Sequence, residues 1–232
     1  MEVSMDTTEQ YDCLLDLAKK RRTVRQFKPD PVPDEYITKI IDVARWAPSG
    51  FHTQPWEFVV IKDPEVKAKI VAALDEHGPA IKDPSKRDIA RSSFRDAPVF
   101  ILALIDWRAK VGLPYAPRTN EEAAPLYHSS MANAFLLMHL AATSLGLASQ
   151  WYTSTSRPAA ERAIREIVGI PEALTIYDMM VLGYPAAAPG AKIVRDLADM
   201  VHYDACGEQD FRTDDEVEEY ARATRTWCMG QH

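Results

Sequence analysis

The sequence predicts a single α+β domain, and three observations lead to it. Helix-like and strand-like patterns alternate along the chain without a regular repeat. Two largely apolar runs, Val99 to Ile105 and Tyr177 to Tyr184, have the length and composition of buried strands. Hydrophobic residues make up 47% of the 232 positions, which is enough for a sizeable core. We expect the domain to cover residues 9–202, with residues 203–232 as a C-terminal extension.

The first third of the chain predicts two helices and a strand. Residues 9–20 carry apolar side chains at helical spacing. After a proline-rich break, a second helix is expected over about 35–46, with Asp34 as its N-cap. A loop rich in turn formers, residues 47–56, leads into a strand over 57–62.

The middle third predicts one central strand and one long helix. A helix opens at Asp63-Pro64, and a polar excursion over 75–97 separates it from the strand that begins at Val99. A second excursion, 106–125, contains several prolines. Residues 126–146 are apolar around most of a helical circumference, so this helix is expected to be buried between layers.

The last third begins with a short strand or loop at residues 147–153. An amphipathic helix follows over 158–168, and then comes the second buried strand. A charged terminal helix is expected over 213–226, with Thr213 as its N-cap.

Composition and charge exclude several classes of partner. The net charge of −7 disfavours non-specific binding to nucleic acid or to anionic membranes. No apolar run reaches the length of a membrane span, and the N-terminus lacks the pattern of a signal peptide. The three cysteines are few and unpatterned, which is typical of a reducing compartment. We therefore expect a cytoplasmic protein with a small-molecule substrate, no nucleic acid and no membrane.

Several common catalytic sites have no counterpart in the sequence. There is no glycine-rich dinucleotide or nucleotide loop and no serine nucleophile elbow. The six histidines lack the spacing of a zinc site, so no metal is expected. His139 is interpreted as a core histidine whose hydrogen bonds are satisfied, and Cys13, which lies among leucines, as buried and inert.

A cluster of arginines follows the first predicted helix. Arg21, Arg22 and Arg25 lie within five positions, with Thr23 among them. Guanidinium groups grip phosphate oxygens in pairs, and a hydroxyl adds a short donor. If the helix continues through the cluster, Arg21 and Arg25 lie on one face. The alternative is a solvated basic corner without a ligand.

A second polar stretch lies in the loop Pro48-Ser49-Gly50-Phe51-His52-Thr53-Gln54-Pro55-Trp56. Its hydroxyl, imidazole and carboxamide groups could hydrogen-bond a planar heterocycle that has both donors and acceptors. The alternative for its last three residues is a tight loop in which Trp56 fills the core.

Taken together, four motifs in order resemble the FMN-dependent nitroreductase superfamily. They are RRTVRQF, APSGFHTQPWEFVV, GLASQWYT and VLGYPAAAP, the last with Arg195 behind it, and the resemblance spans roughly residues 10 to 200. It implies a nitroreductase-like fold, with a central, mostly antiparallel sheet flanked by helices. It also implies a domain-swapped homodimer with FMN sites at the interface, in which terminal extensions wrap the partner.

The same resemblance implies roles for individual residues. Arg21, Arg22, Thr23 and Arg25 would bind the FMN phosphate and neighbouring oxygens, and Arg195 would return to the phosphate. The remaining cofactor contacts would be Pro48, Ser49, Gly50, His52, Gln54, Trp151, Tyr152 and Thr153. No protein residue is required as acid or base, because N5 of FMN does the chemistry, and Thr153 is a candidate donor to N5. Contacts with the acceptor are expected from Phe51, Tyr115, Arg118 and Tyr127.

The implied activity is hydride transfer from NADH or NADPH through FMN by a ping-pong mechanism. The acceptor would be an electron-poor aromatic, nitro, quinone or similar compound. One alternative is a reductive dehalogenase of the iodotyrosine-deiodinase type, because APSGFHTQPW and VVIKDPEVKAKI are very similar to that family's segment. The Glu, Tyr and Lys lid of those enzymes has no equivalent in residues 75–96. A flavin-destroying enzyme of the benzimidazole-synthase type shares the PDPVPDE-like entry. The alternative of a different class is a flavin-binding protein without turnover.

Overall fold

The structure is a computed structural model that describes residues 6–77, 94–115 and 119–230, except for the side chains of residues 209 and 225–230. Most of the predicted excursion 75–97 and the whole of Arg118 lie outside the described residues. The chain divides into two compact units, Met1–Ala187 and Ala188–His232.

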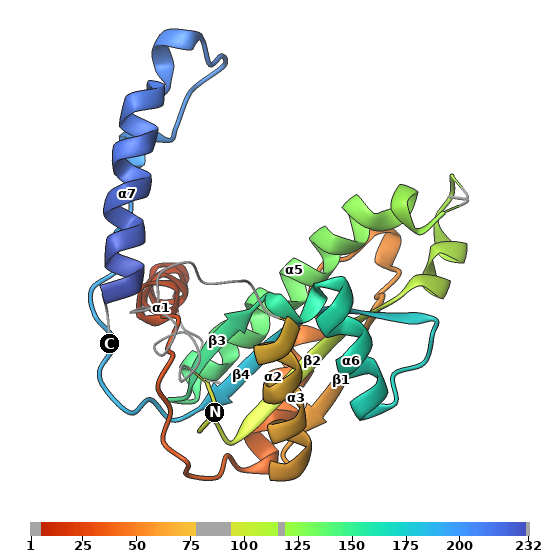
Figure 1. The fold of residues 1–232 in the computed structure, drawn as a ribbon. Helices are drawn as coiled ribbons and strands as arrows, with labels where there is room; N and C mark the ends of the chain where they lie inside the picture. The colour runs from red at the N-terminus through yellow and green to blue at the C-terminus, as the bar shows by residue number, and fades with distance from the viewer. Residues whose placement is uncertain (1–5, 78–93, 116–118, 231–232) are drawn as a thin grey trace. The chain divides into compact units, whose positions relative to one another are not determined.

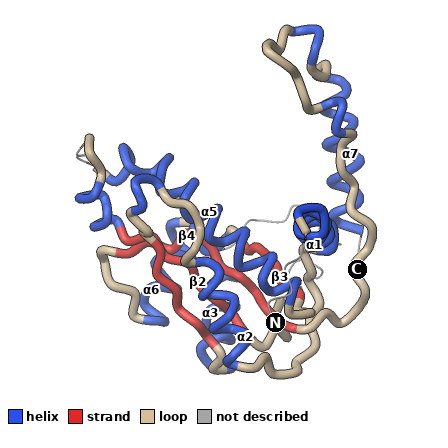
Figure 2. The backbone as a smooth tube through the Cα atoms, turned by 180° about the vertical axis from the view of Figure 1, so that it is seen from behind, coloured by secondary structure: helices blue, strands red, loops and turns tan. Residues whose placement is uncertain are grey.

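The first unit is built on a four-stranded antiparallel sheet, drawn in red in Figure 2. Its strands are β1 (Trp56–Ile61), β2 (Val99–Asp106), β3 (Ala148–Tyr152) and β4 (Leu174–Gly183). The strand order is β1-β2-β4-β3. The α+β class and the antiparallel sheet predicted from the sequence are therefore confirmed.

Helices cover both faces of this sheet (Figure 1). They are α2 (Asp34–Ala44) and α5 (Asn120–Ser144) on one face, and α3 (Pro64–His77) and α6 (Pro158–Val168) on the other. Alternate residues of β2 enter two separate cores, with Ile101 and Ala103 on the α2/α5 side and Phe100 and Leu102 on the α3/α6 side. Because both faces of β2 are covered, its sequence is continuously apolar.

Two predicted helix starts were wrong. The long helix α5 begins at Asn120, six residues before the expected 126, and Pro125 lies inside it. Thr119 is its N-cap, with Oγ1 accepting from the Glu122 N–H at 3.2 Å, so the cap outweighs the hydrogen bond that proline cannot donate. At α2 the N-cap is Pro33, and Asp34 is the first helical residue.

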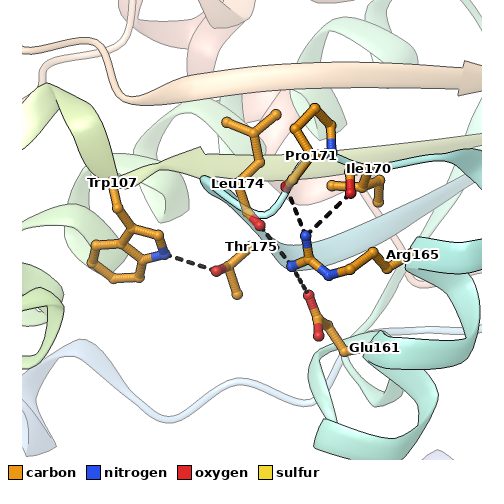
Figure 3. Close-up of polar contacts among 7 residues, drawn as sticks. All are labelled: Trp107, Glu161, Arg165, Ile170, Pro171, Leu174 and Thr175. Atoms are coloured by element: carbon orange, nitrogen blue, oxygen red, sulfur yellow. Dashed lines mark hydrogen bonds and ion pairs between the residues drawn. The ribbon is translucent and has the colours of Figure 1, made fainter.

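The turn from α6 into β4 is held by one arginine (Figure 3). Gly169 ends α6 in the left-handed conformation with φ of 68°, which favours glycine. The Arg165 guanidinium then donates to the carbonyls of Ile170, Pro171 and Leu174, at 3.3, 2.7 and 2.6 Å. It also pairs with Glu161 at 2.5 Å. This network fixes the start of β4.

The first helix, α1 (Thr7–Lys20), has no buried residue. Tyr11 and Leu14 are 62% and 58% exposed, and Cys13 is exposed too, which corrects the expectation of a buried cysteine. Leu15 and Leu17 of the same helix are partly buried, and α1 contacts α5, so only part of its apolar surface is exposed. Among the described residues, no helix has the length and hydropathy needed to cross a membrane.

The second unit contains two short 3-10 turns, η4 (Leu197–Asp199) and η5 (Glu208–Asp210), and the helix α7 (Asp214–Gly230). Thr213 caps α7, as predicted: its Oγ1 accepts from the Glu216 N–H at 3.3 Å, and Glu216 accepts from the Thr213 N–H at 2.8 Å. Tyr203 and Phe211 are 85% and 57% exposed.

Candidate active site

The arginine cluster lies on extended chain and is not part of a helix. Arg21 is the C-cap of α1, with φ of −58° and ψ of 126°, and the chain then runs beside β3. Thr23 forms a bridge with Ser149, and the Val24 N–H donates to the Ser149 carbonyl at 3.1 Å. Arg21 and Arg25 therefore do not share a helix face. Pairing with β3, which local sequence does not reveal, is what ends the helix.

The far end of this segment is attached to the end of β4. Phe27 bridges Pro185, and the Lys28 N–H donates to the Tyr184 carbonyl at 2.9 Å. A Cβ on Gly183 would lie 2.7 Å from Pro98 and 3.2 Å from the Phe27 ring, so only glycine allows this close approach. The Gly-Tyr-Pro motif thus positions the arginine segment across the ends of two strands.

The arginine side chains of this segment are partly buried and lie close to one another in sequence. Burial lowers the pKa of Arg21, and the neighbouring charge of Arg22 lowers it further. Arg22 donates to the carbonyls of Lys19 and Arg21. Within the described residues, no carboxylate forms an ion pair with Arg21 or Arg25, and both side chains are half-buried. Partly buried, uncompensated guanidinium groups are suited to an anion.

The loop 48–55 is fixed against α5. The Gly50 N–H donates to Ser130 Oγ at 3.2 Å, and Asn133 Nδ2 donates to the Pro48 carbonyl at 3.2 Å. Ser49 Oγ accepts from the Gln54 N–H at 3.0 Å. Trp56 is buried at the start of β1, as the core-filling alternative proposed, while the polar residues before it remain accessible.

Three residues of this loop have backbone conformations that non-glycine residues seldom adopt. The φ angles of Phe51, His52 and Gln54 are 50°, 56° and 45°. Such conformations cost about 1–3 kcal/mol each and persist where the surroundings impose them, often at functional sites. The strain places the Gln54 amide 3.1 Å from His52 Nε2. With the amide as donor, His52 carries its hydrogen on Nδ1.

Gly50 is predicted to be essential for this loop. A Cβ there would lie 2.2 Å from Leu126 Cδ1, so Gly50→Ala forces Leu126 or the loop to move. We expect a loss of about 1–3 kcal/mol in the free energy of unfolding, measured by denaturant titration, and weaker FMN binding. Gly112→Ala is the matched control, because its nearest atom, Thr53 Cγ2, is at 3.4 Å. Gly50→Ala combined with Leu126→Ala should restore FMN binding; failure of this rescue would contradict the packing argument.

Of the residues assigned to the acceptor, the structure brings two together. The rings of Phe51 and Tyr115 meet edge to face at 6.0 Å, and both are more than half exposed. Tyr127 is fully buried, stacks on Trp107 at 5.7 Å, and its hydroxyl has no hydrogen-bond partner among the described residues. Phe51 and Tyr115 are therefore the pair that a ligand can reach.

The three candidate residues at the end of β3 point to different surroundings. The Trp151 indole lies on the α5 side, with its N–H donated to Asp178 at 2.6 Å. Tyr152 lies on the opposite side, against Phe94 at 4.6 Å. Thr153 is exposed. The Thr153 side chain is thus the one of the three that remains at the surface to donate to a ligand.

Two buried polar side chains, His139 and Asp178, contact the Trp151 ring. His139, 1% exposed, stacks on Trp151 at 5.6 Å with an interplanar angle of 14°, and its Nδ1 is 2.6 Å from Ser149 Oγ. Burial, with a smaller effect of the Arg21 charge, lowers the pKa of His139 to about 3. Burial raises the pKa of Asp178 to about 6, against the opposing effect of the Trp151 hydrogen bond. His139 is a neutral core histidine, as predicted, but it is not fully satisfied: its Nε2 is buried without a hydrogen-bond partner among the described residues.

Sequence reasoning missed Gln150. This residue is 7% exposed on β3, and its Oε1 atom is buried without a hydrogen-bond partner among the described residues. An orphaned buried acceptor is uncommon and indicates an absent donor, such as a ligand N–H. The available signal was a carboxamide between the apolar residues of a short strand, one position after the residue that pairs with Thr23.

The structure does not test two of the assigned residues, Arg195 and Arg118. Arg195 belongs to the second unit, where it donates to the Asp199 carbonyl at 2.5 Å and its Nε is buried without a partner among the described residues. The role of Arg195 toward a phosphate stays a prediction, as does the role of Arg118 toward the acceptor. In the described part of the chain, no group of three or more acidic, histidine or cysteine side chains is arranged to hold a metal ion.

The loop 48–55 is bonded to one part of α5, and the charge of Arg21 acts on another part. The loop bonds to Ser130 and Asn133, whereas Arg21 acts electrostatically on His139. Nine residues separate Ser130 from His139, which corresponds to about 13 Å of helix. The two motifs are thus related to positions on α5 that are roughly two and a half helical turns apart.

This arrangement of sheet, helices and arginine segment is the nitroreductase fold. The structure superposes on nitroreductase A from Vibrio parahaemolyticus with a TM-score of 0.72 at 17% identity, covering 99% of this chain and 87% of that one. It also superposes on an iodotyrosine deiodinase structure with bound FMN and 3-iodo-L-tyrosine, with a TM-score of 0.65 at 26% identity, covering 83% and 100%.

The chain belongs to the nitroreductase family, whose model matches residues 18–184, and it is an oxidoreductase of that family. An NADH dehydrogenase/NAD(P)H nitroreductase homologue of Methanothermobacter thermautotrophicus is 30% identical over 192 residues, which cover 82% of this chain and 85% of the relative. The iodotyrosine deiodinase of Thermotoga neapolitana is 30% identical over 183 residues, which cover 74% and 88%. The resemblance recognised in the sequence is confirmed.

Proposed function

We propose that the protein binds FMN and oxidises NADH or NADPH, passing the electrons by a ping-pong mechanism to an electron-poor aromatic, nitro, quinone or similar acceptor. The observation that carries the proposal is the arginine segment. Its Arg21 and Arg25 guanidinium groups are half-buried without a carboxylate partner among the described residues, beside an edge strand, in a family that is FMN-dependent. When bound, FMN supplies the hydride-accepting and hydride-donating chemistry.

The chain's own groups fit such a cofactor. Arg21, Arg22 and Arg25, with the exposed Thr23 hydroxyl, match the charge and the donors that a phosphate requires. Gln150 Oε1 is a buried acceptor that needs a donor, and the flavin ring system carries an N–H. The loop 48–55 adds Ser49, His52 and Gln54. Its strained backbone is already fixed in one conformation, so binding costs little conformational entropy there.

The residues act by binding and orientation. The arginines bind the phosphate and the loop contacts the ring, while the Thr153 hydroxyl is the assigned donor toward N5. Phe51 and Tyr115 offer aromatic surface to a planar acceptor. No acid or base from the protein is needed for hydride transfer, which agrees with the neutral state of His139 beneath the site.

We infer further that the active form is a homodimer with terminal segments that wrap the partner. In the first unit, Tyr11 and Leu14 of α1 are 62% and 58% exposed, and Leu136 in the middle of α5 is 47% exposed. In the second unit Leu197 and Tyr203 are 73% and 85% exposed. Exposed apolar side chains on each unit favour an interface with a second copy. Sedimentation should give a dimer mass.

The second candidate is reductive dehalogenation of the iodotyrosine-deiodinase type. It is favoured by local similarity to the rat deiodinase, which is 45% identical over 75 residues, and by the likeness to the deiodinase structure. The matched part covers only 25% of the rat protein, whereas the Thermotoga neapolitana deiodinase matches 74% of this chain at the same 30% identity as the nitroreductase homologue.

Steady-state oxidation of NADH and NADPH separates these candidates. The FMN-loaded protein is assayed with nitroaromatic, quinone, iodotyrosine and halophenol acceptors in parallel. The proposal expects turnover with the first two, while iodide release from iodotyrosine alone would establish the dehalogenase. Bound flavin that no reductant and acceptor pair turns over would identify a flavin-binding protein instead.

A further inference from the structure

The buried carboxyl of Asp178 has no role in the proposed function. It is 7% exposed in a layer of aromatic rings, and it accepts a hydrogen bond from Trp151 Nε1 at 2.6 Å. Among the residues that the structure describes, this indole is its one hydrogen-bond donor. Burial of a carboxyl with a single neutral donor is costly in an apolar layer, so packing alone does not account for it.

The backbone of β4 is adjusted at this position. The register against β2 shifts between Ala103, which pairs with Asp178, and Leu104, which pairs with Ile176, so Tyr177 is the extra residue of a bulge. Bulges re-aim side chains and are common near active sites. Here the bulge puts the Asp178 carboxyl on the α5 side of the sheet, where the Trp151 indole lies.

Trp151 connects this carboxyl to the end of β3. Its ring lies between His139, stacked at 5.6 Å, and Phe135, edge to face at 4.7 Å. Thr153 follows two residues later at the surface. The hydrogen bond to Asp178 is the polar contact of the indole ring, and it adds to the backbone pairing of Trp151 and Tyr152 with β4 at this strand end.

We propose that Asp178 is a positioning residue: through Trp151 it holds the end of β3, and its ionisation controls how firmly that end is held. The proposal rests on the proposed function, which assigns this strand end to the flavin. An ionised carboxylate binds an N–H more strongly than a protonated one does. A firmly held strand end is pre-organised, and pre-organisation strengthens binding.

Of the Tyr177, His139 and Asp178 side chains around this hydrogen bond, Asp178 is the one whose charge changes near neutral pH. Tyr177 on β4 stays protonated, because burial and then the Asp178 charge raise its pKa to about 12. On α5, His139 stays neutral, with Arg21 beyond it, and His128 contacts the Tyr177 ring at 6.0 Å. Burial raises the pKa of Asp178 to about 6, within the range of ordinary assay conditions.

The first test follows the indole N–H resonance of Trp151 by NMR in FMN-free protein, assigned by its loss in Trp151→Phe. We expect it to shift with a midpoint near the Asp178 pKa of about 6, and not to shift in Asp178→Asn. Trp107 is the internal reference, because its indole donates at 2.8 Å to Thr175 Oγ1, which does not titrate (Figure 3). His128→Gln should leave the shift intact. A Trp151 resonance that does not move in the wild type would overturn the proposal.

The second test compares FMN dissociation constants of Asp178→Asn and the wild type. We expect their ratio to be near one at about pH 5 and to rise to about threefold to tenfold at about pH 8, because only the wild type gains the charge-assisted bond. Because both proteins bind the same FMN, titration of its phosphate changes both dissociation constants equally and does not affect their ratio. Thr175→Val, which removes the acceptor of Trp107, should give a ratio that does not change with pH.

The outcomes separate this proposal from the proposed function. A flat ratio together with a titrating Trp151 resonance would show that Asp178 has a structural role only. If the wild type binds no FMN at any pH, the proposed function fails, and the positioning role fails with it. A Trp151 resonance that still titrates would then show that the hydrogen bond between Trp151 and Asp178 is present and that the flavin site is at fault.

Thermal unfolding shows whether the Asp178→Asn variant is folded. It also shows in which direction the ionisation of Asp178 changes stability with pH. The pKa of Asp178 is raised from 3.8 to about 6, so the folded chain holds the proton more tightly than the unfolded chain does. The resulting stability is lost as the pH rises through about 6. The melting temperature of Asp178→Asn should therefore increase relative to the wild type between about pH 5 and pH 8. A constant difference would contradict the burial of the carboxyl.

Discussion

Replacing Arg21 or Arg25 by glutamine is expected to weaken FMN binding by about 10- to 100-fold for each substitution, because each removes a charge-assisted hydrogen bond to phosphate. Both guanidinium groups are half-buried without a carboxylate partner among the described residues. Isothermal titration of the FMN-free protein measures the effect directly.

The same substitutions should not destabilise the FMN-free protein. Arg21 lies beside Arg22 in a partly buried position, and burial followed by that like charge lowers its pKa, so its removal relieves an unfavourable interaction. The melting temperature of Arg21→Gln without FMN should equal or exceed that of the wild type. Lys28→Gln is the matched control, since it removes an exposed charge from the same segment and should leave FMN affinity unchanged. Equal losses in all three variants would indicate a general charge effect instead of a phosphate site.

The largest effect on stability is expected from Arg165→Met, which keeps most of the side-chain volume. The substitution removes the donor for three carbonyls in the turn between α6 and β4, and it leaves Glu161, only 13% exposed, without its partner (Figure 3). Unpairing a largely buried charge is strongly destabilising. We expect a loss of about 2–4 kcal/mol in the free energy of unfolding, measured by denaturant titration.

Lys39→Met is the control for this prediction. Lys39 forms an ion pair with Glu35 at the same i,i+4 spacing, but in α2 and with side chains that are 55% and 71% exposed. Exposed pairs contribute little, so no measurable loss is expected. A similar loss in the two variants would show that helical ion pairing, and not the carbonyl network of Arg165, stabilises the turn.

The parts of the fold that could be predicted from the sequence are those that local pattern determines. β2 was visible because both of its faces are buried, which makes the run from Val99 continuously apolar. α6 was predicted with the bounds it has, 158–168, since its amphipathic period is regular. The start of α5 was missed because Pro125 is usually a boundary signal, and here the Thr119 cap prevails.

The site was predictable in its residue types and not in its geometry. The arginines were identified, but their extended conformation depends on the pairing of Thr23 with Ser149, a contact distant in sequence. The strained backbone of the loop was hidden because Phe51 and His52 are residue types that rarely adopt positive φ. Gln150 and Asp178 were overlooked since single polar residues in apolar strands carry no local signal of the groups they face.

The most direct test of the central claim is anaerobic reduction of the purified protein after incubation with FMN and removal of the excess. We expect the protein to retain the yellow flavin, and NADH or NADPH to bleach its visible absorption band. We also expect a nitroaromatic or quinone acceptor to restore the band, and Arg25→Gln to lose most of the flavin during removal of the excess. A wild-type protein that emerges colourless, or a retained flavin that neither nicotinamide cofactor reduces, would contradict this claim.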